Sequence, residues 1–366
     1  MGVAPVAAPF RCVSPASTPR SRREALAMLS AAGACALVNP RLSFAQTGGS
    51  MPRIIDTHHH IYPPRYVTQN LQRLLDDATA LPASAYQSWT PSLALEQMDK
   101  AGVASAVTSI TSPGIWFDDG EKARARARDC NEFGAQMMRD FPGRFGMFAA
   151  IPLPDTEGSL SEITYALDVL KHDGIGVLTS YAGKLLGDPA FAEVFAELNR
   201  RKAKVFVHPT MSCCGNVFPG VSGPTIEFPV DTGRAIASLL LRGTFAACPD
   251  IKFMFSHGGG ILPSIVQRVV GAVRTMTPEE KATRVPKGPD YELQRQFYDV
   301  ASVAINPAGM AAVLKLFPIT QITYGSDAPF GSTTGIADAL TKLGLSNHDL
   351  TAIQRENALR LFPRFG

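Results

Sequence analysis

Cysteine, tryptophan and histidine are scarce in this chain. It has 366 residues, with 6 cysteines, 2 tryptophans and 7 histidines. Cys12 and Cys35 precede the region with a globular pattern, and the four later cysteines form no CxxC pair. These counts argue against a zinc ribbon or another thiolate metal site. The adjacent Cys213 and Cys214 are expected to be small buried or pocket-lining residues, with a strained vicinal disulfide as the alternative.

Strong charge, long apolar runs and glycine-rich nucleotide loops are also missing. A net charge of +3 with 18% charged residues gives no basic face for nucleic acid. No apolar run reaches the roughly 20 residues of a membrane-spanning helix. No GxGxxG motif follows any expected strand, which argues against a dinucleotide-binding fold. A hydrophobic content of 45% is ordinary for a globular protein with a large core.

The first 46 residues are expected to be a targeting segment and not part of the fold. Arg22 and Arg23 precede a weakly apolar run over 25–38, and the small residues at 43–45 fit signal-peptidase cleavage after Ala45. This pattern predicts periplasmic export by the twin-arginine route. The alternative is a disordered tail, rich in proline, serine and alanine, on a cytoplasmic protein. Residues 53–366 are expected to form a single domain.

Beyond residue 53, apolar runs typical of strands alternate with amphipathic stretches typical of helices. Because helical crossovers join successive strands, the sheet is expected to be parallel and buried on both faces. Eight such units predict an α/β fold of the (β/α)8 TIM-barrel class, with an open doubly wound sheet as the alternative. The strands are expected near residues 54, 104, 146, 175, 204, 252, 297 and 322.

Three consecutive histidines end the first expected strand, in the stretch RIIDTHHHIY over residues 53–62. Successive side chains in a strand point to opposite faces. His58 and His60 therefore share a face, and His59 points the other way, where packing or a hydrogen bond would support the strand. Two imidazoles that converge at the end of a barrel strand are typical of a metal site.

Histidine or aspartate ends three further expected strands. VFVHP ends in His208, MFSH ends in His257, and TYGSD ends in Asp327. Active sites of (β/α)8 barrels lie at the C-terminal ends of the strands, so these side chains are expected to meet His58 and His60. Imidazole with carboxylate suits Zn²⁺, and also Fe²⁺ or Mn²⁺. The two remaining histidines, at 172 and 348, lie among polar helical residues and are expected to be solvated.

The order HxH, H, H, D resembles the amidohydrolase superfamily, and within it the amidohydrolase-related decarboxylases. The resemblance covers about residues 53–363 through DTHHHIYPP, VFVHPT, FSHGGGILPSIVQR and YGSDAPF. No lysine ends the fourth expected strand, which disfavours the binuclear members that bridge two metals with a carbamylated lysine. The resemblance implies one divalent ion, Zn²⁺ first and Mn²⁺ second. It implies these ligands: His58, His60, His208 and Asp327.

The resemblance also implies a reaction, the non-oxidative decarboxylation of a small hydroxyaromatic acid of the 6-methylsalicylate type. The metal would bind oxygens of the substrate, and His257 or Asp327 would deliver a proton to the ring carbon. The alternative within the same superfamily is hydrolysis of a lactone, ester or amide. A non-enzymatic metal-binding protein would be expected to have a broken site, whereas all five residues are present.

Substrate contacts are implied by the same resemblance. Arg268, eleven residues after His257, would enter the site of a partner subunit and hold a substrate carboxylate, so a homodimer is expected. The alternative for Arg268 is a solvent-exposed arginine on a surface helix. The stretch WTPSLALEQMD lacks the arginines that bind a second carboxylate in the semialdehyde decarboxylases, which favours a monocarboxylic substrate. Core packing is the alternative role for the candidate ring-contacting residues, which are Trp89, Trp116, Phe218 and Phe228.

Overall fold

Eight parallel strands form the centre of the protein. The computed structural model describes residues 54–77, 81–117, 119–211 and 221–366. The strands pair in the order β1-β2-β3-β4-β7-β8-β9-β10, which confirms the (β/α)8 class. Their bounds are β1 Ile54–His60, β2 Val103–Ser109, β3 Phe145–Ala150, β4 Gly174–Leu178, β7 Lys204–His208, β8 Lys252–Phe255, β9 Phe297–Asp299 and β10 Ile322–Thr323. All eight lie where the sequence predicts them.

The barrel closes between its first and last strands. β10 is only two residues long and ends before Asp327, where the expected strand ends, and the chain after it continues along β1. Thr57 N–H donates to the carbonyl of Tyr324 at 2.9 Å, and Asp327 N–H donates to that of His58 at 2.8 Å. His60 N–H then donates to the carbonyl of Ala328 at 2.7 Å. These bonds hold the chain around Asp327 beside the histidines of β1.

Between Asp56 and His59, β1 contains an extra residue relative to its neighbour β2. Asp56 pairs with Ala106 and His59 pairs with Thr108, so three steps along β1 match two steps along β2. Such a bulge changes which side chains face each way. Ile55 packs with the apolar residues of the lower barrel, whereas His58 and His60 turn toward the other inward-facing histidines.

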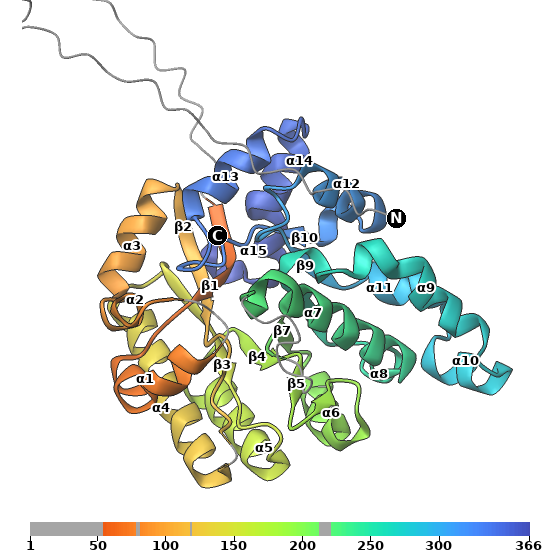
Figure 1. Cartoon of the computed structure of the whole chain (residues 1–366), viewed down its shortest axis with the longest axis horizontal. Helices are drawn as coiled ribbons and strands as arrows, with labels where there is room; N and C mark the ends of the chain where they lie inside the picture. Colours follow the sequence, from red (N-terminus) through yellow and green to blue (C-terminus); the bar gives the residue numbers. More distant parts are fainter. Residues whose placement is uncertain (1–53, 78–80, 118, 212–220) are drawn as a thin grey trace, which may run out of the picture. The chain divides into compact units, whose positions relative to one another are not determined.

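Helices surround the strands (Figure 1). Local signals set their ends: Thr90 Oγ1, for example, accepts from Leu93 N–H at 3.1 Å and begins α3. Between β4 and β7 the chain adds a small antiparallel pair, β5 Ser180–Tyr181 and β6 Lys184–Leu185. The α-helices are α1 Pro64–Asp76, α2 Ala83–Gln87, α3 Pro91–Lys100, α4 Gly120–Asp140, α5 Thr156–Thr164, α6 Ala192–Arg200, α7 Gly223–Leu241, α8 Thr244–Ala247, α9 Leu262–Arg274, α10 Pro278–Arg284, α11 Pro289–Gln294, α12 Pro307–Leu316, α13 Thr333–Thr341, α14 Asn347–Thr351 and α15 Asn357–Leu361.

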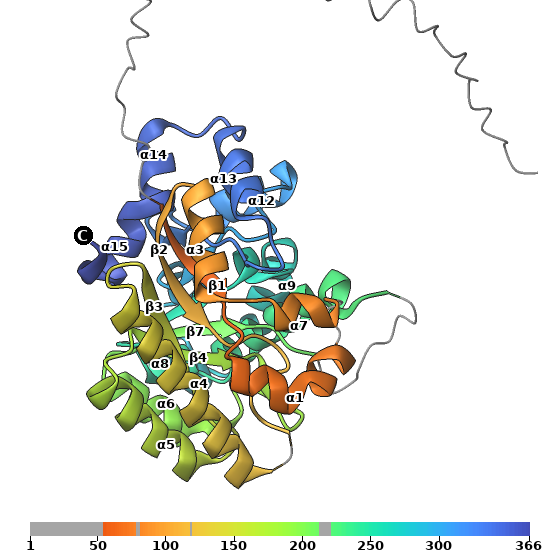
Figure 2. The ribbon, with the colours of Figure 1, turned by 90° about the vertical axis from the view of Figure 1, so that its left-hand side faces the viewer.

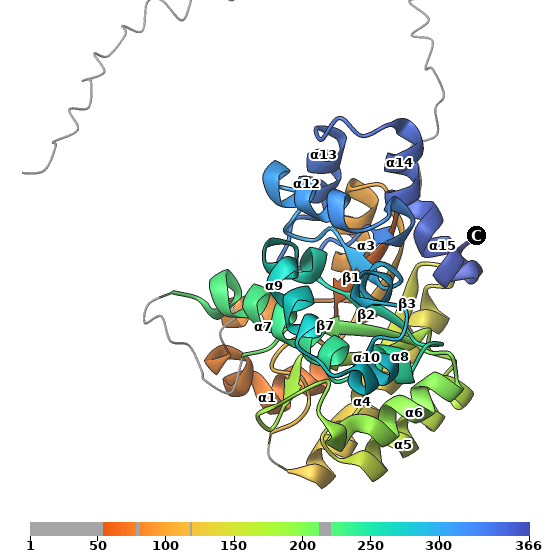
Figure 3. The ribbon, with the colours of Figure 1, turned by 90° about the vertical axis from the view of Figure 1, so that its right-hand side faces the viewer.

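The two side views place α1 and the start of α7 at the same end of the barrel (Figures 2 and 3). That end is where the strands finish, so loops after β1 and β7 border the cavity described below. No helix in the described ranges is long and apolar enough to cross a membrane. The predicted targeting segment, Cys213, Cys214 and Phe218 all lie outside the described residues.

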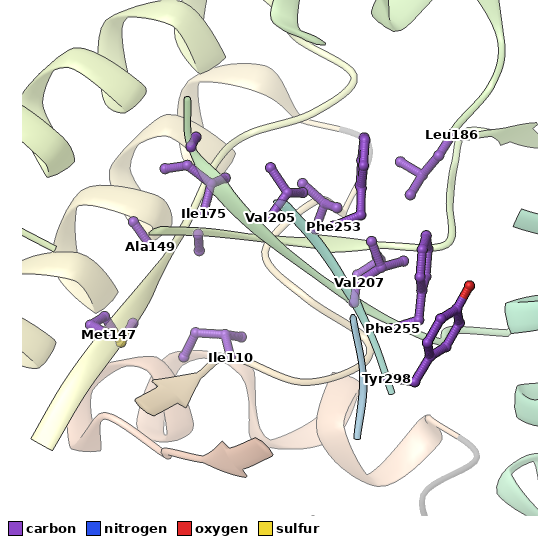
Figure 4. Close-up of a cluster of buried hydrophobic side chains, with 14 of the residues drawn as sticks. Ile110, Met147, Ala149, Ile175, Leu186, Val205, Val207, Phe253, Phe255 and Tyr298 are labelled. Carbon is purple, nitrogen blue, oxygen red and sulfur yellow. The ribbon is translucent and has the colours of Figure 1, made fainter. Parts of the chain in front are cut away.

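Apolar side chains pack on both sides of the strands. Ile175, Val205 and Phe253 come from the neighbouring strands β4, β7 and β8 and belong to the cluster shown in Figure 4. A second cluster gathers side chains from six strands inside the barrel and adds Phe362 and Phe365 from the C-terminus. Burial of this apolar surface favours folding at roughly 25 cal/mol per Å². The inner cluster packs against the histidines at the ends of the strands, with the ring of Phe206 5.1 Å from the ring of His58.

His172 corrects one expectation. The sequence predicts a solvated side chain, yet His172 is only 6% exposed. A π-helical turn over Tyr165–Val169 and a left-handed Lys171 (φ 60°) precede it and turn it inward. Burial lowers the pKa of His172 to about 4, even though the charge of Asp173 acts to raise it.

Candidate metal centre and active site

Five side chains meet where the strands end. His58 and His60 belong to β1, and His208 is the last residue of β7. His257 lies two residues after the end of β8, and Asp327 lies four residues after the end of β10. One ligand atom from each of His58, His60, His208 and Asp327 can be chosen so that all four lie within 4.8 Å of one another. The structure therefore brings the predicted ligand set together across 270 residues of sequence.

The Nδ1 atoms of the three histidines have partners of their own. Nδ1 of His58 lies 2.8 Å from Oδ2 of Asp299, and Nδ1 of His208 lies 2.8 Å from the carbonyl oxygen of Pro209. Both partners are acceptors, so each Nδ1 carries a proton, and Nε2 is the nitrogen whose lone pair a metal ion would use. Ser109 Oγ lies 3.2 Å from Nδ1 of His60 and can accept in the same way.

The Nε2 atoms point at one another and at one carboxylate. The Nε2 atoms of His58 and His60 are 3.0 Å apart. Oδ1 of Asp327 lies 3.0 Å from Nε2 of His58, 3.1 Å from that of His60 and 4.0 Å from that of His208. Lone pairs and a carboxylate oxygen at such distances repel unless a positive charge, a metal ion or a proton, lies between them. This donor set is the one that Zn²⁺ and Mn²⁺ accept.

The charges around the cluster also favour a bound cation. Burial lowers the pKa of His60 to about 4 and that of His208 well below its ordinary value, so both are neutral ligands at working pH. Burial would also lower the pKa of His58, but the carboxylates of Asp299 and Asp327 raise it to about 10. Burial would raise the pKa of Asp327, yet the imidazoles beside it hold that pKa well below its usual range. Two buried carboxylates thus favour positive charge at this point.

His257 stands beside this cluster on the cavity side. Its Nε2 lies 3.2 Å from Oδ2 of Asp327, the oxygen that does not face the other imidazoles. Its backbone is left-handed (φ 55°), and its N–H donates to Oδ1 of Asp299 at 2.9 Å. The side chain is 12% exposed, so it can exchange a proton with a bound molecule.

Asp299 is the site residue that sequence reasoning missed. Its two oxygens accept from His58 Nδ1 and from the N–H groups of His257 and Ala301. A carboxylate behind a ligating histidine fixes the tautomer and the orientation of the ring. The available signal was position: Asp299 ends the apolar run QFYD, as His208 and Asp327 end theirs.

His59 has the supporting role predicted for it. Its side chain is buried, and its Nδ1 lies 3.1 Å from Oδ2 of Asp56. Asp56 in turn accepts from the hydroxyl of Ser326 at 2.6 Å and from Ser326 N–H at 3.0 Å. This network ties β1 to the segment that carries Asp327.

A cavity of about 340 Å³ opens above the cluster. His208, His257 and Asp327 form its polar side, and the ring of Phe228 forms part of its wall, 6.1 Å from the ring of His208. The volume suits a small organic ligand. The remaining lining residues are Leu81, Thr111, Ser222, Pro224, Pro229, Ser302 and Phe330.

Three other predicted contact residues lie elsewhere. Trp89 is buried between Tyr62 and Phe133, with ring centroids 6.4 and 6.2 Å away, so its contacts are packing contacts. Trp116 lies outside the cavity wall as well. Arg268 is exposed on α9 and makes no hydrogen bond or ion pair with the described part of the chain. Within one chain it does not reach the cavity.

Comparisons with known proteins agree with this geometry. The profile of the amidohydrolase family matches residues 55–364. A 6-methylsalicylic acid decarboxylase of Penicillium expansum is 33% identical over 320 residues, covering 85% of this chain and 96% of that protein. A decarboxylase of Aspergillus niger is 33% identical over 332 residues, covering 85% and 88%. A solved dihydroxybenzoic acid decarboxylase of Polaromonas, with manganese and an inhibitor bound, matches with a TM-score of 0.75 at 19% identity, covering 86% of this chain and 97% of that one.

Proposed function

The chain belongs to the amidohydrolase family, and from that membership we propose that it is a metal-dependent, non-oxidative decarboxylase of a small hydroxyaromatic carboxylic acid. One observation carries the proposal. Imidazole nitrogens and a carboxylate oxygen converge beside a 340 Å³ cavity, with His257 on the free oxygen of Asp327. The decarboxylases to which the chain is 33% identical over 85% of its length support a carboxy-lyase over a hydrolase.

We assign the ligands of one divalent ion as His58, His60, His208 and Asp327. A divalent ion in that place would neutralise the carboxylate and the ortho oxygen of the substrate. The manganese in the Polaromonas relative supports Mn²⁺ beside the Zn²⁺ expected from the donor set. The two ions differ in preferred coordination, and the tetrahedral preference of Zn²⁺ leaves less room for a second substrate oxygen.

The reaction breaks the bond between the ring and the carboxyl carbon, releases CO₂, and puts a proton on the ring carbon. The candidates for the donor of that proton are His257 and Asp327, which share a 3.2 Å contact and both line the cavity. His257 is the donor that we favour. Its ring is partly exposed to the cavity, whereas Oδ1 of Asp327 is committed to the three imidazoles.

The cavity wall favours a monocarboxylic substrate. Among the described lining residues none is lysine or arginine, and most are apolar or hydroxyl-bearing. A second carboxylate on the substrate would find no lysine or arginine among these residues. It would lose its hydration on binding without gaining an ion pair in return. An acid of the 6-methylsalicylate type, with one carboxylate and one small apolar substituent, fits this wall.

Assembly and export complete the proposal. Arg268 has no partner in the described part of its own chain, which leaves it available to a neighbouring subunit in a homodimer. Arg22 and Arg23, followed by the apolar run over 25–38, support twin-arginine export to the periplasm.

The deciding experiment is direct. Metal-loaded protein is incubated with 2-hydroxy-6-methylbenzoate, and CO₂ and 3-methylphenol are measured together. Equal amounts of the two products support the proposal, and His257→Ala serves as the inactive control. Hydrolysis of lactones or esters by the same preparation, with no CO₂ from any hydroxybenzoate, would contradict it.

A further inference from the structure

A third left-handed residue lies on the cavity wall beside His257 and Asp327. Ser302 follows β9 and lines the cavity. Its φ is 58°, close to the 55° of His257 and the 60° of Asp327. A non-glycine residue pays a steric penalty in this region, and such residues gather at functional sites. The two companions of Ser302 are the residues to which the chemistry is assigned.

The other left-handed, non-glycine residues of the described chain have ordinary structural reasons. Lys171 and Lys202 follow the ends of a π-helix and of α6, where a left-handed residue commonly ends a helix. Ala182 lies in the turn of the β5–β6 hairpin, which needs positive φ. Ser302 ends no helix and joins no hairpin, so its conformation needs another explanation.

The turn at Ser302 is tight and anchored. Val303 N–H donates to the carbonyl of Ala301 at 2.6 Å, which closes a three-residue turn with Ser302 at its centre. With positive φ at the centre this is the rare and strained form of the γ-turn. Ala301 N–H donates to Oδ1 of Asp299 at 2.9 Å. The carboxylate that orients His58 and His257 therefore also fixes the turn that presents Ser302.

The side chain at this position is chemically informative. Glycine would adopt the same φ at no steric cost, yet the chain carries a hydroxyl there. Ser302 is exposed, and its Oγ makes no hydrogen bond with the described residues. Its neighbours on the wall include the apolar Leu81, Phe228 and Phe330. Thr111 and Ser222 also line the cavity, and a hydroxyl with no partner among the described residues, as at Ser302, can select a polar group on the ligand.

We propose that the Ser302 hydroxyl hydrogen-bonds a polar ring substituent of the substrate that the metal does not hold, and so determines which substituted hydroxybenzoates the site accepts. The inference rests on the proposed function for the class of ligand. The inference goes beyond the proposed function because it assigns a specificity-determining residue and explains why the strained turn is present.

The test separates the hydroxyl from the backbone. Ser302→Ala removes the hydroxyl and keeps the strain, whereas Ser302→Gly removes both. The matched control is Lys202→Gly, a left-handed position outside the cavity. Each protein is assayed with 2,6-dihydroxybenzoate, which has a second hydroxyl, and with 2-hydroxy-6-methylbenzoate, which has a methyl group in that place. Affinity of the metal-loaded proteins for both acids is measured by calorimetry.

We expect both Ser302 variants to lose about tenfold in kcat/KM or in affinity for the dihydroxy acid, the size of one lost hydrogen bond, and less than twofold for the methyl acid. Both glycine variants should melt at a temperature no lower than the wild type, because strain is relieved. Equal effects of Ser302→Ala on the two acids, or none, would overturn the inference. If the wild type binds the acids without releasing CO₂, and Ser302→Ala still weakens binding of the dihydroxy acid alone, only the proposed function is contradicted. A wild type that neither binds nor converts either acid overturns both the proposed function and this inference.

Discussion

Oδ2 of Asp299 lies 2.8 Å from Nδ1 of His58, between residues 241 positions apart in sequence. Asp299 also accepts from the backbone N–H of His257 at 2.9 Å. One carboxylate thus orients a proposed metal ligand and the proposed acid. Neither contact involves a substrate, so the effect of Asp299 on the chemistry passes through its partners.

Replacing Asp299 should weaken metal binding more than it weakens the fold. Asp299→Ala is expected to lower metal affinity about 10- to 100-fold, because the His58 ring loses the partner that fixes its tautomer. Asp299→Asn keeps an acceptor for the N–H groups of His257 and Ala301 and should lose less. Competition with a fluorescent chelator measures the affinity. The control is Asp168→Ala, an exposed carboxylate that pairs with Arg201 at 2.8 Å; a loss of equal size there would remove the special role of Asp299.

His257→Ala should separate metal binding from turnover. The side chain contacts Oδ2 of Asp327 and not the converging Nε2 atoms, so elemental analysis should still find one metal ion per chain. Turnover should fall about 10²- to 10⁴-fold, the usual contribution of a positioned acid or base. If the metal is lost with the activity, His257 is a ligand instead.

Removing the metal should cost stability as well as activity. Without a metal ion the Nε2 atoms of His58 and His60 still lie 3.0 Å apart beside the Asp327 carboxylate, and only a proton on His58 can replace the missing positive charge. Dialysis against a chelator should therefore abolish CO₂ release and lower the melting temperature, and either Zn²⁺ or Mn²⁺ should restore the fold. Rates with the two ions, measured at equal occupancy, identify the one that supports turnover. Full activity at a metal content near zero would show that turnover needs no metal ion.

Arg268 can be tested by subunit mixing. Arg268→Ala and His257→Ala should each be inactive as homodimers. If Arg268 acts across the interface, a heterodimer of the two has one intact site, formed by His257 of one chain and Arg268 of the other. An equal mixture refolded together should recover about a quarter of wild-type activity, as a symmetric dimer requires. Recovery near zero would mean that Arg268 acts within its own chain or in no site.

His172 should make the fold sensitive to acid. Its pKa is about 4 in the folded protein and about 6.5 in an unfolded chain. Between those values the unfolded state binds more protons, so the free energy of unfolding falls as pH falls from about 6.5 to about 4, by up to about 3 kcal/mol. Denaturant titrations across this range should show a flatter dependence for His172→Leu than for the wild type. His348→Gln, which alters an 81% exposed side chain, should leave the slope unchanged.

The fold and the convergence of five residues could be predicted because their signals are local. A strand in a barrel shows as an apolar run, and a residue at its end shares one edge with all the others. The position of Asp299 at the end of an expected strand is a local signal, but its contact with His58 is not, since His58 belongs to another strand. The bulge in β1 is also invisible in sequence, although it decides that His58 and His60, and not His59, face inward.

The sequence does not determine whether Trp89 lines the cavity or packs in the core, or whether His172 is solvated or buried. Trp89 could have lined a pocket or a core, and only the positions of Tyr62 and Phe133 decide for the core. His172 follows a helix with polar neighbours, which predicts solvation. The π-helical turn before it changes its direction, and nothing in the spacing of apolar residues announces that turn.

The proposed metal site is complete only when the barrel closes. His58 and His60 belong to the first strand, and Asp327 follows the last, held there by backbone bonds between Asp327 and His58 and between His60 and Ala328. A nascent chain therefore carries two of the four donors after His60, three after His208, and gains the fourth only when the segment with Asp327 docks. The complete site discriminates among ions only after folding is nearly finished. Whichever compartment the chain folds in supplies the ion, and a chain exported after folding would carry that choice with it.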